Sequence, residues 1–271
     1  MWSLLLACTA PPPPPEPPAD TPAWTDEAAV AAVAARWNHP VIEVPPFLIT
    51  GDNPVYYPRA QQLVTWARDA LRARHFPLDP KETWTIWLFA GDRSYRAHAA
   101  LFFGDDPDTP YGYAAHHDLV MNFATGGGTL VHEMVHPFVA ANHPDAPAWI
   151  NEGLASLYEA TRDDGGRMVP LVNWRLEGLA PAVAAGTAPR IATVVSLDEA
   201  EFYGEDGGMN YAVARYVFLW LHDHDRLDAF WIRWSADTAA DPTGAGALEA
   251  VVGDLAAFQP AWDAWVGTLG G

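Results

Sequence analysis

The amino-acid sequence predicts an α+β fold, in which an N-terminal lobe of strands and helices is followed by a mainly helical C-terminal lobe. Two observations lead to this prediction. Up to about residue 123, short runs rich in β-branched and aromatic residues alternate with segments whose apolar residues recur at helical spacing. From residue 147 onward, the apolar residues recur at helical spacing only. The chain has 271 residues, 50% of them hydrophobic, which is enough to bury a sizeable core.

Residues 1–23 predict an anchor and a spacer rather than part of the fold. The stretch LLAC, which ends at Cys8, resembles the bacterial lipobox, so we expect a lipoprotein signal peptide over residues 1–8 and a lipid on Cys8. Seven of the eight residues 11–18 are prolines, and we expect residues 9–23 to form an extended linker. The resemblance implies a protein of the bacterial cell envelope that contacts a membrane only through its lipid. The alternative is a short apolar N-terminus with an incidental cysteine.

The folded domain is expected to span residues 24–271, with lobes over about 24–145 and 146–271. The first lobe is expected to contain helices over 25–37, 57–75 and 92–102, an extended segment over 41–50, a buried strand over 83–91, and short strands over 111–115 and 118–123. The extended segment, VIEVPPFLIT, contains two prolines that exclude a central strand, so we expect it at an edge of the sheet. The second lobe is expected to contain helices over 148–161, 174–185, 210–224, 225–237 and 246–267.

The charge and the cysteine content exclude several kinds of partner and site. The chain has 34 acidic and 15 basic residues and a formal net charge of −19, which would repel phosphate backbones, so nucleic acid is excluded as a partner. Cys8 is the only cysteine, so the chain can form neither an intramolecular disulfide nor a cysteine-based metal site. Any metal ion must therefore be held by His, Asp or Glu. The sequence does not predict an oligomeric state.

The segment GGGTLVHEMVHPFVAANH carries the pattern H-E-x-x-H at His132, Glu133 and His136. On an α-helix, residues four apart lie on one face, so the two imidazoles can converge on one Zn²⁺ ion. The glutamate between them can take a proton from an attacking water molecule. Apolar neighbours indicate that this helix is buried, and two buried histidines and a carboxylate without partners would be costly. Pro137 crowds the carbonyl one turn back, so we expect a bend just beyond His136.

A catalytic zinc site needs a third protein ligand, with one position left open. The downstream segment WINEGLASLYEA offers Glu152, sixteen residues after His136, near the start of a predicted helix that must fold back along the first. Small residues beside this glutamate permit close packing. His143 is one residue out of register with the H-E-x-x-H-x-x-G-x-x-H pattern of metzincins.

The combination HEMVH…WINEGLASLYE resembles the gluzincin metallopeptidases, and most of all the bacterial peptidase MA-like group. It is also similar, over W-x-N-E-G-x-A, to the aminopeptidase N-like family. The resemblance implies a zincin-like first lobe with a small mixed sheet that carries the motif helix. It also implies one Zn²⁺ held by His132, His136 and Glu152, with Glu133 as general base and a peptide or protein as substrate. Thermolysin-like enzymes carry an aspartate that orients a histidine where this chain has Ser156.

In such enzymes a tyrosine about sixty residues after the ligand glutamate can stabilise the oxyanion, which implies this role for Tyr211. The alternative for Tyr211 is an aromatic residue of the core at a helix N-terminus. The G-x-M-E-N motif of the aminopeptidases is absent, because the equivalent segment reads LVMNF, and this favours an endopeptidase. The rival from another class is a non-catalytic zinc-binding or scaffolding lipoprotein that retains the fold.

Overall fold

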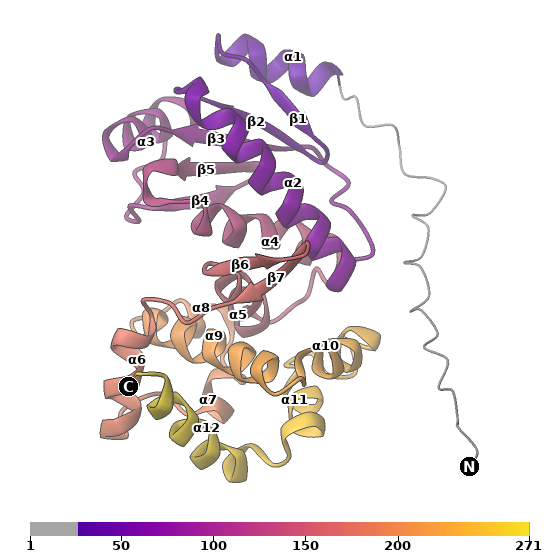
Figure 1. Ribbon diagram of the computed structural model, residues 1–271, viewed down its shortest axis with the longest axis vertical. Coiled ribbons are helices and arrows are strands. Elements are labelled where there is room, and N and C mark those ends of the chain that lie inside the picture. Colours follow the sequence, from indigo (N-terminus) through magenta and orange to yellow (C-terminus); the bar gives the residue numbers. More distant parts are fainter. Residues whose placement is uncertain (1–26, 271) are drawn as a thin grey trace, which may run out of the picture.

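The computed structural model describes residues 27–270 and confirms the α+β class (Figure 1). An N-terminal part contains a five-stranded mixed sheet with helices, and the part that follows is largely helical. The predicted signal peptide, Cys8 and the proline-rich linker lie outside the described residues. Within the described residues, no helix combines the length and the apolar character that a membrane crossing requires.

The elements of the N-terminal part follow the order expected from the sequence. They are α1 (Glu27–Arg36), β1 (Ile42–Val44), β2 (Phe47–Gly51), the 3-10 helix η1 (Pro54–Tyr56), α2 (Tyr57–Arg74), β3 (Trp84–Phe89), α3 (Asp92–His98), the π-helical turn η2 (Ala99–Phe103), β4 (Gly112–Ala115), β5 (Asp118–Asn122), the 3-10 helix η3 (Phe123–Thr125) and α4 (Gly128–Asn142).

The strand order in the sheet is β1-β2-β3-β5-β4. The central strands β2, β3 and β5 are parallel, whereas β1 and β4 pair antiparallel to their neighbours and form the two edges. The expectation that residues 41–50 form a single edge segment was therefore wrong for Phe47–Gly51, which is an interior strand. Pro45 and Pro46 lie in the turn between β1 and β2, so neither proline removes a hydrogen bond from the interior ladder.

Both faces of the sheet are covered by helices, which explains why its strands are continuously apolar. Alternate residues of a strand point to opposite faces. In β3, Ile86 and Leu88 belong to the core cluster shared with α2 and α4. Trp87 and Phe89 belong to a second cluster, shared with α1 and α3. The motif helix α4 thus lies on the same face of the sheet as α2.

The C-terminal part contains eight helices and one hairpin within the described residues. They are α5 (Ala148–Leu157), β6 (Thr161–Asp164), β7 (Arg167–Pro170), α6 (Leu176–Ala185), α7 (Ile191–Val194), α8 (Glu199–Phe202), α9 (Gly207–Asp223), α10 (Leu227–Ala236), α11 (Ala245–Val252) and α12 (Leu255–Leu269).

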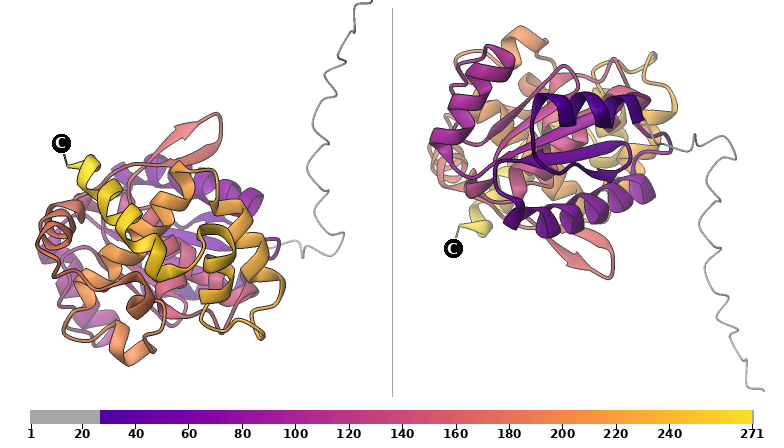
Figure 2. Two further views of the ribbon diagram at one scale, coloured as in Figure 1. Left: turned by 90° about the horizontal axis from the view of Figure 1, so that it is seen from below. Right: turned by 90° about the horizontal axis from the view of Figure 1, so that it is seen from above.

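Two expectations for this part are corrected. The chain leaves α5 before residue 161 and forms the β6–β7 hairpin, which projects from the body of the protein (Figure 2). Glycines at positions 165 and 166, both with positive φ, supply the turn of the hairpin. The helix expected over 246–267 is two helices, because Gly253 has a φ of +85° and ends α11.

The helices α4, α5 and α9 pack together where the sheet meets the helical part (Figure 1). Gly153 permits the close contact between α5 and α9. A Cβ atom at this position would lie 2.7 Å from Phe218 Cδ2 and 3.2 Å from the Ala214 carbonyl oxygen. Gly153 of the WINEGLA segment therefore permits close packing, and its contact is with α9, whereas Glu152 beside it faces α4.

Candidate metal centre

His132 and His136 lie one helical turn apart on α4 and face the same direction. Their ring centroids are 5.0 Å apart, and both side chains are largely buried, with 8% and 18% of their surface exposed. The helix continues through Pro137 to Asn142, so the proline does not end it, and the bend beyond His136 stays a prediction.

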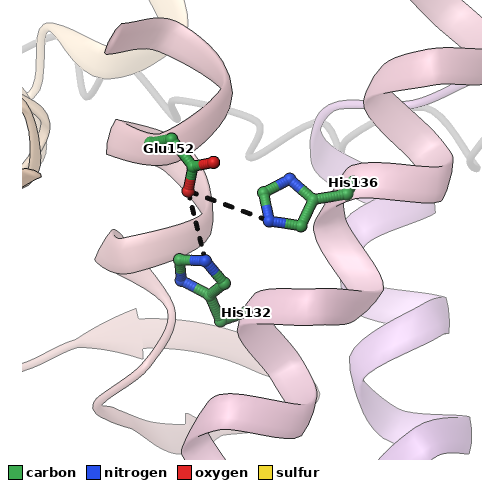
Figure 3. Close-up of side chains that lie close together, drawn as sticks. All are labelled: His132, His136 and Glu152. Atoms are coloured by element: carbon green, nitrogen blue, oxygen red, sulfur yellow. Dashed lines mark ion pairs between the residues drawn. The ribbon is translucent and has the colours of Figure 1, made fainter. Parts of the chain in front are cut away.

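Glu152 on α5 completes a group of three possible metal ligands (Figure 3). Its Oε2 atom lies 3.2 Å from His132 Nε2 and 3.8 Å from His136 Nε2, and the three ligand atoms lie within 4.8 Å of one another. Glu152 is 4% exposed. The structure thus brings together the three residues that the sequence analysis predicted as metal ligands.

The three ligand atoms are close enough to converge on one ion. Two ligands at about 2.0–2.1 Å from Zn²⁺ and at a tetrahedral angle lie about 3.3 Å apart. The distance of 3.2 Å between Glu152 Oε2 and His132 Nε2 matches this value, and the other two separations are wider, 3.8 Å and at most 4.8 Å. Glu152 Oε2 is buried and has no hydrogen-bond partner among the described residues. A buried carboxylate oxygen without a partner is costly, and a cation between it and the two imidazole nitrogens would remove this cost.

Each histidine has a polar partner at its other ring nitrogen, as metal-binding histidines usually do. His136 Nδ1 lies 2.9 Å from Asn151 Oδ1, within hydrogen-bond geometry. Donation from Nδ1–H leaves the lone pair of His136 on Nε2, the nitrogen that faces Glu152. His132 Nδ1 lies 3.1 Å from Glu159 Oε1, although the two atoms are not aligned for a full hydrogen bond.

Glu159 supplies the carboxylate that faces His132, a role that the thermolysin-like aspartate has in those enzymes. Ser156, at the position of the thermolysin-like aspartate, is fully buried, and its hydroxyl has no hydrogen-bond partner among the described residues. Glu159 lies just beyond the end of α5 and supplies the carboxylate instead. A Cβ atom on Gly128, the first residue of α4, would lie 2.1 Å from the Glu159 carbonyl oxygen, so this glycine lets the segment after α5 approach the motif helix.

Glu159 is itself held by two residues after the hairpin. Arg175 donates from Nε to Oε2 at 3.0 Å and from Nη2 to Oε1 at 2.6 Å, a two-pronged pair. Asn173 Nδ2 donates to Glu159 Oε2 at 3.0 Å. Sequence reasoning missed Asn151, Glu159 and Arg175. Only Asn151, the immediate neighbour of Glu152, could have been suspected from the sequence.

The charges of the group stabilise one another. Burial alone lowers the pKa of His132, but the neighbouring Glu152 and Glu159 outweigh burial and raise this pKa to about 10. Burial raises the pKa of Glu152, but the two histidines and the Tyr203 hydroxyl hold it at about 2. The pKa of Glu159 is also about 2, because His132 and Arg175 outweigh the effect of burial. The carboxylates are thus ionised and ready to bind a cation.

Glu133 is buried beside the three possible ligands and is not one of them. It is 8% exposed, and its Oε2 lies 3.9 Å from His136 Nε2. Burial raises the pKa of Glu133 above that of an ordinary carboxyl group, while His132 and His136 act against this rise. A carboxylate with a raised pKa accepts a proton more readily than an ordinary one.

Two tyrosines border the group. Tyr211, the candidate oxyanion stabiliser, is half-buried near the start of α9, and its ring stacks on His132 with centroids 6.4 Å apart. It also packs against the apolar core. Burial raises the pKa of Tyr211, and the nearby Glu152 carboxylate raises it further, so the Tyr211 hydroxyl stays protonated. Tyr203, which sequence reasoning missed, donates to Glu152 Oε1 at 2.6 Å.

The group lies in a cleft of about 980 Å³. The cleft is bordered by β4, by α4 and α5, and by the loops before α6 and α9. Its lining includes all the site residues that were predicted from the sequence, namely His132, Glu133, His136, Glu152 and Tyr211. His143 lies elsewhere, with its ring against Trp231 and Trp234 at centroid distances of 5.5 and 4.9 Å, and is not a member of the group.

The chain matches no protein-family model and has no significant similarity to any curated protein. Over residues 27–270, the fold and the site define an α+β protein with one His-His-Glu group that can hold a metal ion. The placement of this group on α4 and α5 is consistent with a site of the H-E-x-x-H type.

Proposed function

We propose that the protein is a zinc-dependent metallopeptidase that acts as an endopeptidase. The observation that carries the proposal is the convergence of His132, His136 and Glu152 in a cleft with Glu133 beside them. A purely structural zinc site is usually closed by four protein ligands. Here three possible ligands line an open cleft together with a buried carboxylate that has no need to bind the metal, which favours catalysis.

A bound Zn²⁺ would polarise a carbonyl group and make a water molecule more acidic. Residues of the chain would transfer the proton, stabilise the oxyanion and orient the ligands. Glu133 would take a proton from the attacking water and pass it to the leaving amine. Tyr211 would donate its hydroxyl proton in a hydrogen bond to the developing oxyanion. Asn151 and Glu159 would hold the two imidazoles in the orientation that directs Nε2 to the ion.

The free edge of β4 supports an extended peptide as the substrate. Tyr111 accepts a hydrogen bond from the Asn122 N–H at 2.8 Å, which makes these two residues a hydrogen-bonded pair of the antiparallel ladder. By alternation, the backbone groups of Gly112 and Ala114 point away from β5. Both residues line the cleft. An extended substrate can therefore add to the sheet as a further strand and pass the candidate metal centre.

The proposal is tested by zinc analysis combined with digestion of a peptide library. We expect about one zinc ion per chain, cleavage within peptides rather than at their ends, and loss of cleavage on chelation with recovery on return of zinc. Zinc binding without cleavage would support the rival class, a non-catalytic zinc-binding protein. Absence of zinc binding would overturn the proposal. We also propose that a lipid on Cys8 anchors the protein in the bacterial cell envelope, which mass spectrometry of the protein from a bacterial host would test.

Glu159→Gln is expected to weaken zinc binding by roughly 10–100-fold. The amide keeps the size of the side chain but removes the negative charge that faces His132 Nδ1 and pairs with Arg175. The affinity is measured by competition with a chelator of known strength. Glu249→Gln on α11 is the matched control, since this glutamate is exposed and lies outside the cleft. Unchanged affinity in Glu159→Gln would show that Glu159 does not support the ligand.

Tyr211→Phe is expected to lower kcat by about 10²–10³-fold and to leave zinc affinity unchanged. The substitution removes only the hydroxyl, while the ring that packs on His132 and the core is retained. Steady-state kinetics with a peptide found in the library digest measures the effect. A kcat equal to that of the wild type would assign Tyr211 to the core and remove it from the catalytic residues.

A further inference from the structure

Two exposed aromatic residues face each other across the mouth of the cleft. Tyr111, directly before β4, is 43% exposed, and Trp174, in the loop between β7 and α6, is 57% exposed. Their rings are nearly parallel, with centroids 6.4 Å apart and an interplanar angle of 23°. Both residues line the cleft. They come from the two sides of the cleft, one from the sheet and the other from the helical part.

The backbone on each side is fixed, although the rings are exposed. The Asn122 N–H and side chain donate to the carbonyl oxygens of Tyr111 and Pro110, both at 2.8 Å. On the other side, the buried Tyr216 hydroxyl lies 3.3 Å from the Asn173 nitrogen and 3.2 Å from its carbonyl oxygen.

The Trp174 ring is also held by a cation–π contact. The Arg175 guanidinium lies 4.4 Å from the centroid of this ring, and the same guanidinium is paired with Glu159. Exposed rings on a restrained backbone lose little entropy when they bind a partner, which is typical of binding positions rather than of loose surface residues.

We propose that Tyr111 and Trp174, the aromatic pair, bind a large apolar side chain of the peptide substrate next to the cleaved bond. This rests on the proposed function. A peptide that pairs with Gly112 and Ala114 must pass Tyr111, which immediately precedes them on the same edge strand. A side chain that leaves this peptide toward the opposite wall meets Trp174. An aromatic or branched aliphatic side chain would cover the exposed part of both stacked rings, whereas alanine would leave that part in water.

The charged residues near the aromatic pair also favour an apolar side chain at this position. Arg175 is the one lysine or arginine among the residues that line the cleft, and its guanidinium is already paired with Glu159. It is therefore not free to bind a substrate carboxylate. Asp108 on the rim is exposed and would disfavour an acidic side chain close by.

The test compares a peptide cleaved in the library digest with an analogue in which the large apolar residue beside the cleaved bond is alanine. The ratio of kcat/KM for the two peptides measures the preference. The same two peptides, labelled for fluorescence anisotropy, are titrated with zinc-loaded Glu133→Gln protein, which measures binding without turnover. We expect wild type to prefer the apolar peptide, and Tyr111→Ala and Trp174→Ala each to reduce this preference by roughly tenfold or more in both measurements.

Control variants test whether the preference depends on the aromatic pair itself and not on its surroundings. Tyr111→Ala leaves the contact between Trp174 and Arg175 in place, so its zinc affinity should equal that of the wild type. Tyr111→Phe and Trp174→Phe keep an aromatic ring and should retain the preference. Ile232→Ala removes an exposed apolar side chain on α10, outside the cleft, and should change nothing.

The outcomes distinguish this inference from the proposed function. Cleavage with a preference that survives both alanine substitutions would overturn the aromatic pair and leave the peptidase intact. Binding of the apolar peptide that depends on both rings, without any cleavage, would support the pair and overturn the peptidase. Binding of a chito-oligosaccharide, but of no peptide, that is lost in both alanine variants would overturn the inference, because the rings would then stack on sugars.

Discussion

Glu133→Gln is expected to lower kcat by roughly 10²–10⁴-fold while the protein still binds one zinc ion. The glutamine side chain has the size and polarity of the glutamate, so the buried position beside His136 keeps its packing. An amide cannot take a proton from water, and the general base would be lost. The measurement is single-turnover cleavage of a library-derived peptide, paired with zinc analysis of the same preparation.

The controls for this experiment separate base catalysis from damage to the metal site. Glu249→Gln makes the same chemical change on the exposed surface of α11 and should leave kcat unchanged. Zinc content and thermal unfolding temperature of Glu133→Gln should match the wild type, since Glu133 is not a member of the His-His-Glu group. Undiminished cleavage by a zinc-loaded Glu133→Gln protein would exclude Glu133 as the base.

The ligand residues of the site could be predicted from local structure for the two histidines and from one further assumption for Glu152. His132 and His136 are four residues apart on one helix, and helical geometry alone places them on one face. Glu152 required one further assumption, that the next helix folds back along the first, and the small residues beside it favoured this packing. The chemistry of a metal restricts the choice of ligand, so few sequence positions competed for each role.

Apart from Asn151, the residues that orient these ligands could not be predicted, because they depend on tertiary contacts. Glu159 lies after α5 has ended, and its position relative to His132 is set by the close approach to Gly128. Arg175 reaches Glu159 only because the β6–β7 hairpin returns the chain to this place. Tyr203 reaches Glu152 from the residue that follows the short helix α8. No spacing rule in the sequence connects these pairs.

The errors in the fold have related causes. The prolines at 45 and 46 were assigned to a strand, although they form the turn between two strands, so an interior strand was placed at the edge. The hairpin over 161–170 was overlooked because its first strand is largely exposed and polar, and period-2 alternation is weak there. Long, strongly periodic elements such as α2 and α9 were found near their observed bounds, because burial of an apolar face largely determines them.

Glu152→Ala is expected to weaken zinc binding by about 10²–10³-fold and to abolish cleavage at ordinary zinc concentrations. A structural zinc ion is bound with about 10–16 kcal/mol over four ligands, so one ligand accounts for roughly 2.5–4 kcal/mol. Glu152 also supplies the one negative charge among the three ligands, and its loss leaves the ion with two neutral imidazoles. Titration with zinc in the presence of a competing chelator measures the change.

The matched variants decide whether this loss belongs to the metal ligand or to general damage. Glu249→Ala removes an exposed carboxylate and should leave zinc affinity unchanged. His143→Ala should also be harmless to zinc binding, since this ring packs between Trp231 and Trp234 and lies outside the group. Glu152→Asp keeps the charge but withdraws it by one methylene, so an intermediate affinity is expected. Full zinc affinity in Glu152→Ala, with loss in His143→Ala, would overturn the His-His-Glu assignment in favour of three histidines.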